Sequence, residues 1–247
     1  MENASISYKN LRQVIGWLGV ALPILVLTQS ILVGDCNYLQ DSFNHYNITL
    51  SNTIYNGILW GLGIVLLFYP TYENDPKDEG TLTTIAGLCA IGVSVFPITP
   101  NSNSICTIFY WDESSLNAGI HNFCAGIMLL ILSYISVSVF TRTGEGNNLR
   151  DNKHRWKVRR NYIYTTMGWI TFLSVAVIAM LTLLENDPDF SFTTKYIFWL
   201  EVSALLSFGI SWIVKGGFVL TDDSDVSTIG NVKQLFTYDD YLINHEN

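Results

Sequence analysis

The sequence has little charge for its length. Only 14% of its 247 residues are Asp, Glu, Lys or Arg, whereas soluble domains carry about 25%. Together with a mean hydropathy of +0.28, this shortage excludes a disordered chain and a coiled coil. The net charge is −8, so the protein lacks an overall basic surface, and we expect no nucleic-acid partner.

The sequence also lacks the short motifs of the common catalytic and nucleotide-binding sites. It has no nucleophile elbow, P-loop, zincin motif or dinucleotide fingerprint. It has four His and four Cys, but their spacing does not supply the three or four ligands that a transition metal needs. We therefore expect no metal site and no cofactor.

What the sequence does have is long apolar runs. Residues 50–70, 80–111, 114–141 and 161–184 contain no charged residue. A helix needs about 20 apolar residues to cross the ~30 Å hydrocarbon core, and soluble helices keep a polar face that these runs lack. The N-terminal run 11–33, whose one charged residue is Arg12, is longer than the apolar core of a signal peptide, so we interpret it as a retained helix.

These runs predict an all-α, polytopic membrane protein with six transmembrane helices. The helices are expected near 11–33, 50–70, 80–99, 115–141, 161–184 and 193–217. The chain then divides into a transmembrane domain, 1–217, and an acidic tail, 218–247. The run Asp222-Asp223-Ser224-Asp225 in this tail resembles a Ca²⁺-binding cluster, but it lacks the Gly and the last Glu of an EF-hand loop.

The distribution of basic residues predicts the orientation. With six helices, twelve of the 13 Lys and Arg residues fall on the side of the two termini, and Lys195 falls on the other side. Basic residues in short loops stay in the cytoplasm, so both termini are expected there. The loop 142–160 is the most basic and is expected to contact anionic lipid headgroups.

Two cysteines fall on the predicted non-cytoplasmic side, where disulfides persist. Cys36 follows the first helix and Cys106 lies in the third connecting loop. They are a candidate disulfide, provided that their Cα atoms lie within about 7 Å. Asn47-Ile48-Thr49 on the same side is a glycosylation sequon.

Polar side chains collect near the outer ends of the predicted helices. Glu201 is the only acid placed inside a membrane segment, and an ionisable group there should face the bundle interior or a wet cavity. The candidate residues of a ligand-binding polar pocket are Ser51, Asn52, Tyr55, Asn56, Asn117, His121, Asn122 and Glu201.

Glu201 and His121 allow two interpretations. They either share a proton and lock the bundle, or belong to an outward-facing pocket that binds a lipid or small molecule. Our leading hypothesis is a non-enzymatic binding protein of the plasma membrane. The alternatives are a membrane-embedded hydrolase that uses Glu201, His121 and Ser51, and a proton-coupled transporter in which Glu201 titrates.

Several short stretches along 11–217 carry a family resemblance. They are Leu11-Arg12 with Gly16 to Pro23, Ala90-Ile91-Gly92-Val93 before Phe96-Pro97, His121, Phe140-Thr141-Arg142-Thr143, Arg160-Asn161-Tyr162-Ile163-Tyr164, Phe198-Trp199-Leu200-Glu201, Phe208-Gly209-Ile210-Ser211-Trp212 and Val214-Lys215-Gly216. With them the chain resembles the bacterial six-helix membrane proteins related to domain of unknown function 998. The stretch before the second helix departs from that family's Ser-Ile-Ser-x-Tyr-Tyr-Tyr-Thr pattern, since only Ser51 and Tyr55 match.

More remotely, such proteins resemble the CREST superfamily, which includes metal-dependent lipid amidases with a Ser, an Asp and three His in the site. In this resemblance, Ser51 corresponds to the Ser of that site. The third predicted helix has no Asp, however, and the last has no His. The resemblance therefore does not carry the hydrolase activity to this chain.

Overall fold

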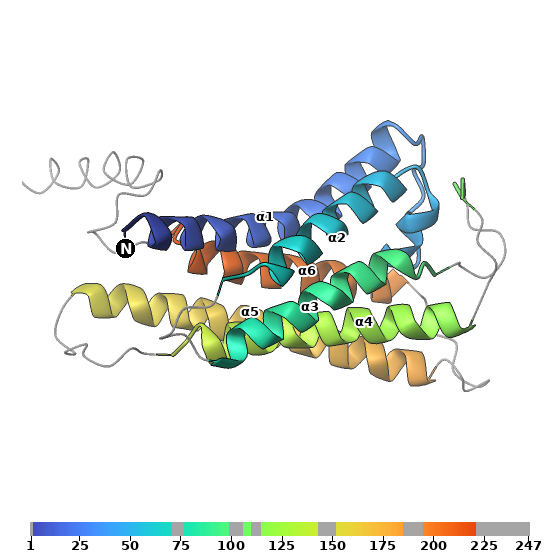
Figure 1. Ribbon diagram of the computed structural model, residues 1–247. Helices are drawn as coiled ribbons and strands as arrows, with labels where there is room; N and C mark the ends of the chain where they lie inside the picture. The colour runs from blue at the N-terminus through green and yellow to red at the C-terminus, as the bar shows by residue number, and fades with distance from the viewer. Residues whose placement is uncertain are drawn as a thin grey trace, which may run out of the picture.

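The computed structural model of the protein describes residues 2–70, 77–98, 106–109, 115–142, 152–184 and 195–220. Within these ranges most of the chain is helical, and each of the six predicted segments contains an α-helix (Figure 1). The α-helices are α1 (Glu2–Leu32), α2 (Asn52–Leu67), α3 (Lys77–Val95), α4 (Ser115–Tyr134), α5 (Asn152–Leu184) and α6 (Lys195–Lys215). A 3₁₀ helix, η1 (Phe43–Ile48), precedes α2, and a π-helical turn, η2 (Ile135–Val139), continues α4.

Four of the described helical segments are long and apolar enough to cross a membrane: Tyr8–Leu32, Ser115–Val139, Lys157–Leu184 and Lys195–Lys215. The apolar helices Asn52–Leu67 and Glu79–Val95 are shorter. A proline ring disfavours the helical conformation of the residue before it. Pro70 and Pro97 therefore explain why these two helices end before the predicted boundaries. Large apolar side chains also face outward, with Leu32, Phe68 and Leu183 75–78% exposed. Such a surface and such helices indicate a membrane protein.

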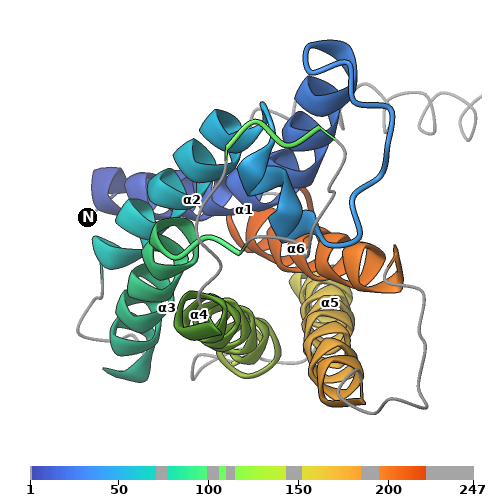
Figure 2. The ribbon, with the colours of Figure 1, turned by 90° about the vertical axis from the view of Figure 1, so that its right-hand side faces the viewer.

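The six helices form a closed ring in chain order, in which α1 packs on α6 (Figure 2). Glycines allow close approaches between helices. A Cβ atom on Gly209 of α6 would lie 2.8 Å from the carbonyl oxygen of Gly16 in α1, and one on Gly87 of α3 would lie 2.7 Å from that of Gly63 in α2. Small residues at these crossings let the backbones touch, as is typical of helix packing in lipid.

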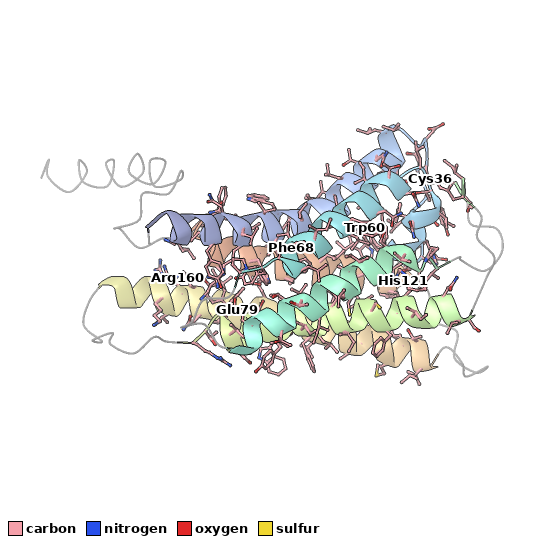
Figure 3. All side chains as sticks on the ribbon, viewed as in Figure 1. Cys36, Trp60, Phe68, Glu79, His121 and Arg160 are labelled. Carbon is pink, nitrogen blue, oxygen red and sulfur yellow. A yellow bond between two sulfur atoms is a disulfide. The ribbon has the colours of Figure 1, made fainter. Side chains whose placement is uncertain are left out.

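At one end of the ring, the segment 33–51 includes η1, which packs against α1, α2 and α6 (Figure 2). The predicted pairing of Cys36 with Cys106 is confirmed: the two form a disulfide, with their Cα atoms 5.9 Å apart. We name this the disulfide end. Arg160 lies at the opposite end (Figure 3), which we name the basic end. Residues 221–247, most of the predicted tail with its acidic run, lie outside the described residues.

Candidate ligand cavity at the disulfide end

Glu201 of α6 holds the segment 33–51 in place at the disulfide end. Its carboxylate accepts hydrogen bonds from the hydroxyl of Ser42 at 2.9 Å, the backbone N–H of Phe43 at 2.6 Å and the side-chain amide of Asn44 at 2.8 Å. Ser42 is also the N-cap of η1, where its side-chain oxygen accepts the N–H of Asn44. Three consecutive residues therefore solvate the carboxylate, which offsets the cost of burying its charge.

An apolar cavity of about 380 Å³ lies beside Glu201, inside the helix ring. Small-molecule pockets occupy about 300–1,000 Å³. The polar end is formed by Glu201, Asn44, Tyr55 and Asn122, and the Tyr55 hydroxyl donates to the side-chain oxygen of Asn44 at 2.8 Å. The deeper wall is formed by Leu22, Leu59, Met128, Leu129, Val175 and Leu205. Between Asn122 and Leu129 the wall extends about 10 Å along α4.

The cavity opens between α4 and α5. Its lining includes Asn122 of α4 and Thr182 and Leu183 of α5, all of which are exposed on the surface of the bundle. Gly126 lies on the α4 wall, and a Cβ atom there would meet no other atom within 4 Å. The opening therefore faces the surface that carries exposed apolar side chains.

The chemistry of this cavity favours one kind of ligand. Among the described residues that line it, Glu201 is the one charged group. An ionised carboxylate only accepts hydrogen bonds. The polar end thus suits a hydroxyl or ammonium head, the apolar wall suits a hydrocarbon chain, and an anionic head would be repelled.

A different polar cavity contains three of the predicted pocket residues. Asn52, Asn56 and Asn117 line a space of about 540 Å³ together with Asn47 and Ser94. The side-chain oxygen of Asn47 accepts from the amides of Asn52 and Asn56, at 2.7 and 2.8 Å, and Ser94 donates to Asn56 at 2.7 Å. Asn47 is only 1% exposed, so an oligosaccharide has no access to this sequon in the folded chain.

The predicted sharing of a proton between His121 and Glu201 is wrong. His121 is fully buried, and its Nδ1 lies 2.7 Å from the carbonyl oxygen of Phe96, while Nε2 has no hydrogen-bond partner. The partners of Glu201 all come from the segment before α2. Ser51 is also fully buried, and its hydroxyl donates to the carbonyl of Val26 at 2.9 Å. The eight predicted residues therefore do not form one pocket.

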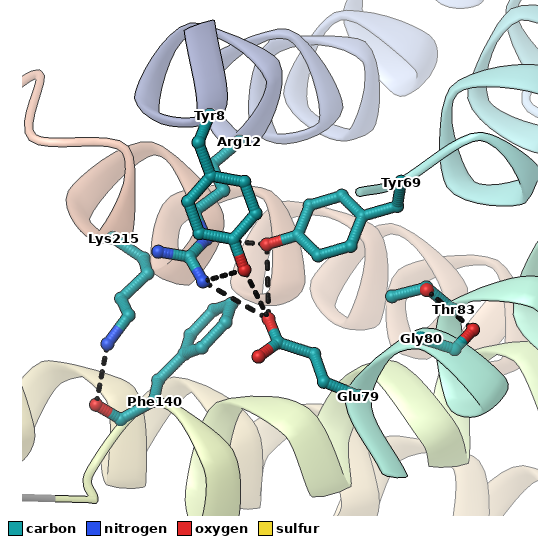
Figure 4. Close-up of polar contacts among 8 residues, drawn as sticks. All are labelled: Tyr8, Arg12, Tyr69, Glu79, Gly80, Thr83, Phe140 and Lys215. Carbon is teal, nitrogen blue, oxygen red and sulfur yellow. Dashed lines mark hydrogen bonds and ion pairs between the residues drawn. The ribbon is translucent and has the colours of Figure 1, made fainter. Parts of the chain in front are cut away.

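At the basic end, the structure contains a buried ion pair that the sequence analysis missed. Arg12 of α1 lies 3.1 Å from the carboxylate of Glu79 in α3, and the two side chains are only 11% and 2% exposed. The Arg12 guanidinium also donates to the hydroxyls of Tyr8 and Tyr69, each at 2.6 Å (Figure 4). Glu201 is therefore not the one acid inside the helix bundle.

Tyr69 links this pair to the end of α2. Its hydroxyl donates to the Glu79 carboxylate at 3.1 Å while it accepts from Arg12. A phenolic hydroxyl is both a donor and an acceptor, so it bonds both partners at once. The signal in the sequence is that Arg12 and Glu79, of opposite charge, border two apolar runs on the same predicted side.

Comparisons with known proteins find no relative of the chain. No family model matches the chain, and no curated protein and no solved structure is significantly similar to it. Among the described residues, no group of three or more His, Cys, Asp or Glu side chains is arranged to hold a metal ion. The functional argument therefore depends on the cavity itself.

Proposed function

We propose that this chain is a six-helix integral membrane protein that binds an amphiphile in the cavity beside Glu201. In this proposal both termini are cytoplasmic and the disulfide end lies outside, in agreement with the positive-inside rule. The helix α2 covers about 24 Å, and local thinning of the bilayer accommodates such a short span. From the family resemblance we further propose that the membrane is the plasma membrane of a bacterium.

The observation that carries the proposal is the cavity of about 380 Å³, with an apolar wall and a single carboxylate at its polar end. Its opening between α4 and α5 would face the acyl chains of the bilayer. A hydrocarbon chain enters from that side without crossing water, while its head reaches Glu201 and Asn122. The ligand class is a single-chain amphiphile with a hydroxyl or ammonium head.

Photolabelling tests this proposal. The purified chain in phosphatidylcholine nanodiscs is labelled with an alkylamine that carries a terminal diazirine, and the labelled peptides are identified by mass spectrometry. We expect saturable labelling of 122–129 and 175–183. Dodecylamine and dodecanol should compete for it more strongly than dodecanoate, because Glu201 repels an anionic head.

Two glycines of α4 supply a matched pair of variants. Gly126→Leu fills the cavity and should abolish the competed labelling. Gly119→Leu adds the same side chain to the same helix outside the cavity lining, where a Cβ atom also has no neighbour within 4 Å. It should behave as the unmodified chain does. Equal labelling of both variants would reject the cavity as the binding site.

Glu201→Gln separates ligand recognition from anchoring. If Glu201 selects the head, the variant should lose most of the preference for dodecylamine over dodecanoate, by about tenfold for one charged hydrogen bond. If Glu201 serves only to hold Ser42, Phe43 and Asn44, the variant should melt at a lower temperature and keep the preference.

The alternative functions have less support. A hydrolase needs an accessible nucleophile, but the Ser51 hydroxyl is buried and donates to a backbone carbonyl. A proton-coupled transporter needs a polar path. The side chains that would form one are Ser203, Ser207 and Ser211, which lie four residues apart on one face of α6. The Ser211 hydroxyl lies 2.7 Å from that of Ser136 in η2, which favours helix packing at this face.

A further inference from the structure

A pocket lined by basic side chains lies at the basic end, at the ends of α1, α5 and α6. Its volume is about 200 Å³, several times the ~30 Å³ that a water molecule occupies in the liquid. The basic side chains that line it are Lys9, Arg142, Lys157, Arg160 and Lys215, and the described lining includes no acid. We name this the basic pocket.

Two of these side chains are held in place by neighbouring groups. The Nζ atom of Lys215 donates to the carbonyl of Phe140 at 3.0 Å (Figure 4). It also lies 5.2 Å and 5.6 Å from the ring centroids of Phe140 and Tyr164. Arg160 donates to the carbonyl of Leu220 at 2.7 Å. An ammonium has three donors, so Lys215 keeps further N–H groups for a ligand.

The electrostatics of the basic pocket call for an anion. Lys215 is close enough to Lys157 and Arg160 for their charges to interact, and like charges in a confined space repel one another. The buried acid at this end, Glu79, is bonded to Arg12. A multivalent anion would relieve the repulsion and satisfy several donors at once.

We infer that the basic pocket is a binding site for a phosphate group, carried either by an anionic lipid headgroup or by a soluble phosphate compound. Arg and Lys together match phosphate well, because Arg binds its oxygens in bidentate fashion and Lys binds as a point charge. Basic pockets between transmembrane helices on the cytoplasmic side accept such headgroups. This site is independent of the amphiphile cavity at the disulfide end.

A titration of the full chain in phosphatidylcholine nanodiscs tests this inference. The probes are dioctanoyl phosphatidic acid, inorganic phosphate and, as the neutral-headgroup control, dioctanoyl phosphatidylcholine. The full chain includes Asp222, Asp223 and Asp225, which follow Leu220 in sequence. Their carboxylates therefore compete with the probes for the basic side chains in every measurement. We expect saturable calorimetric binding of at least one of the two anionic probes. We expect none of the phosphatidylcholine, because its choline ammonium cancels the charge of its phosphate.

Variants locate the site. Lys157→Gln and Arg142→Gln should each weaken binding about tenfold, the loss expected for one charged hydrogen bond. Arg159→Gln is the matched control, because Arg159 is exposed on the same helix and does not line the basic pocket. It should change the affinity less than twofold. The two test positions lie on different segments, so failure of one variant to fold leaves the other as a test.

The two sources of phosphate give different results. Equal affinity for inorganic phosphate and competition between the probes would indicate a soluble ligand, whereas binding of the lipid alone would indicate a headgroup. No saturable binding of either probe, or an equal loss in Arg159→Gln, would overturn the inference. Gly126→Leu should leave phosphate binding unchanged, so this result stands apart from that of the proposed function.

Discussion

At the residue scale, the buried Arg12–Glu79 ion pair makes single substitutions at the basic end costly. Glu79→Gln removes the negative charge and leaves the guanidinium of Arg12 buried beside the ring of Tyr8, 3.9 Å from its centroid. Breaking one side of a buried pair costs about 3–5 kcal/mol, because the remaining charge is uncompensated. We expect Glu79→Gln and Arg12→Gln each to lower the thermal midpoint in detergent markedly.

A double-variant cycle checks that the two residues act as a pair. Arg12→Gln with Glu79→Gln should lose less stability than the sum of the single losses. Asp35→Asn is the control, since Asp35 is an exposed acid at the disulfide end and Asn tolerates its φ of 47°. It should change the unfolding free energy by less than about 0.5 kcal/mol. Additive single losses would contradict the pairing.

Residue partners were predictable only where topology alone decides them. Cys36 and Cys106 follow from the count of helices, which puts both on one side. The inward orientation of Glu201 follows from its charge, but its partners Ser42 and Asn44 do not, because the segment 33–51 folds back over the helix ends without a periodic pattern. The burial of Glu79 was not predictable, because a charged residue beside an apolar run is typical of a loop. Its pairing with Arg12, which makes burial possible, is not visible in the sequence.

At the element scale, two glycines of α2 distinguish helix contact from helix propensity. A Cβ atom on Gly63 would lie 2.7 Å from Ile91 and 3.0 Å from the carbonyl oxygen of Gly87, whereas one on Gly57 would meet nothing within 4 Å. Gly63→Ala should therefore push α2 away from α3 and cost about 1–3 kcal/mol. Gly57→Ala should be neutral or stabilise by up to about 1 kcal/mol. Thermal midpoints in detergent compare the two, and equal effects would argue against a close α2–α3 crossing.

The apolar runs predicted the existence of the six described α-helices but not their ends. Hydropathy marks where a chain enters and leaves hydrocarbon, whereas backbone sterics decide where a helix stops. Thus α2 and α3 end before Pro70 and Pro97, inside their apolar runs. In contrast, α1 and α5 begin at Glu2 and Asn152, among polar residues that a helix accommodates outside the bilayer.

At the scale of the whole molecule, two unrelated kinds of chemistry favour the same orientation. The basic pocket and Arg12 lie at one end, where the positive-inside rule places the cytoplasm. The Cys36–Cys106 disulfide lies at the other end (Figure 3), and such bonds persist outside the reducing cytosol. Neither argument uses the other, so their agreement supports the proposed threading.

Labelling of single cysteines tests this threading. The free thiols Cys89 and Cys124 are first replaced by Ser, and Asn103→Cys or Asn147→Cys is then added in loops outside the described residues. With six crossings, Asn103→Cys should react with a membrane-impermeant maleimide in intact cells. Asn147→Cys, in the most basic connecting segment, should react only after permeabilisation, because the proposed threading places it in the cytoplasm. These two sites do not test whether α2 and α3 cross. If neither helix crossed, the orientation of the later helices would be unchanged and Asn103→Cys would remain outside. A third site is therefore needed in the loop between α2 and α3: Asn74→Cys should be protected in intact cells, and its labelling there would reject the six-helix arrangement.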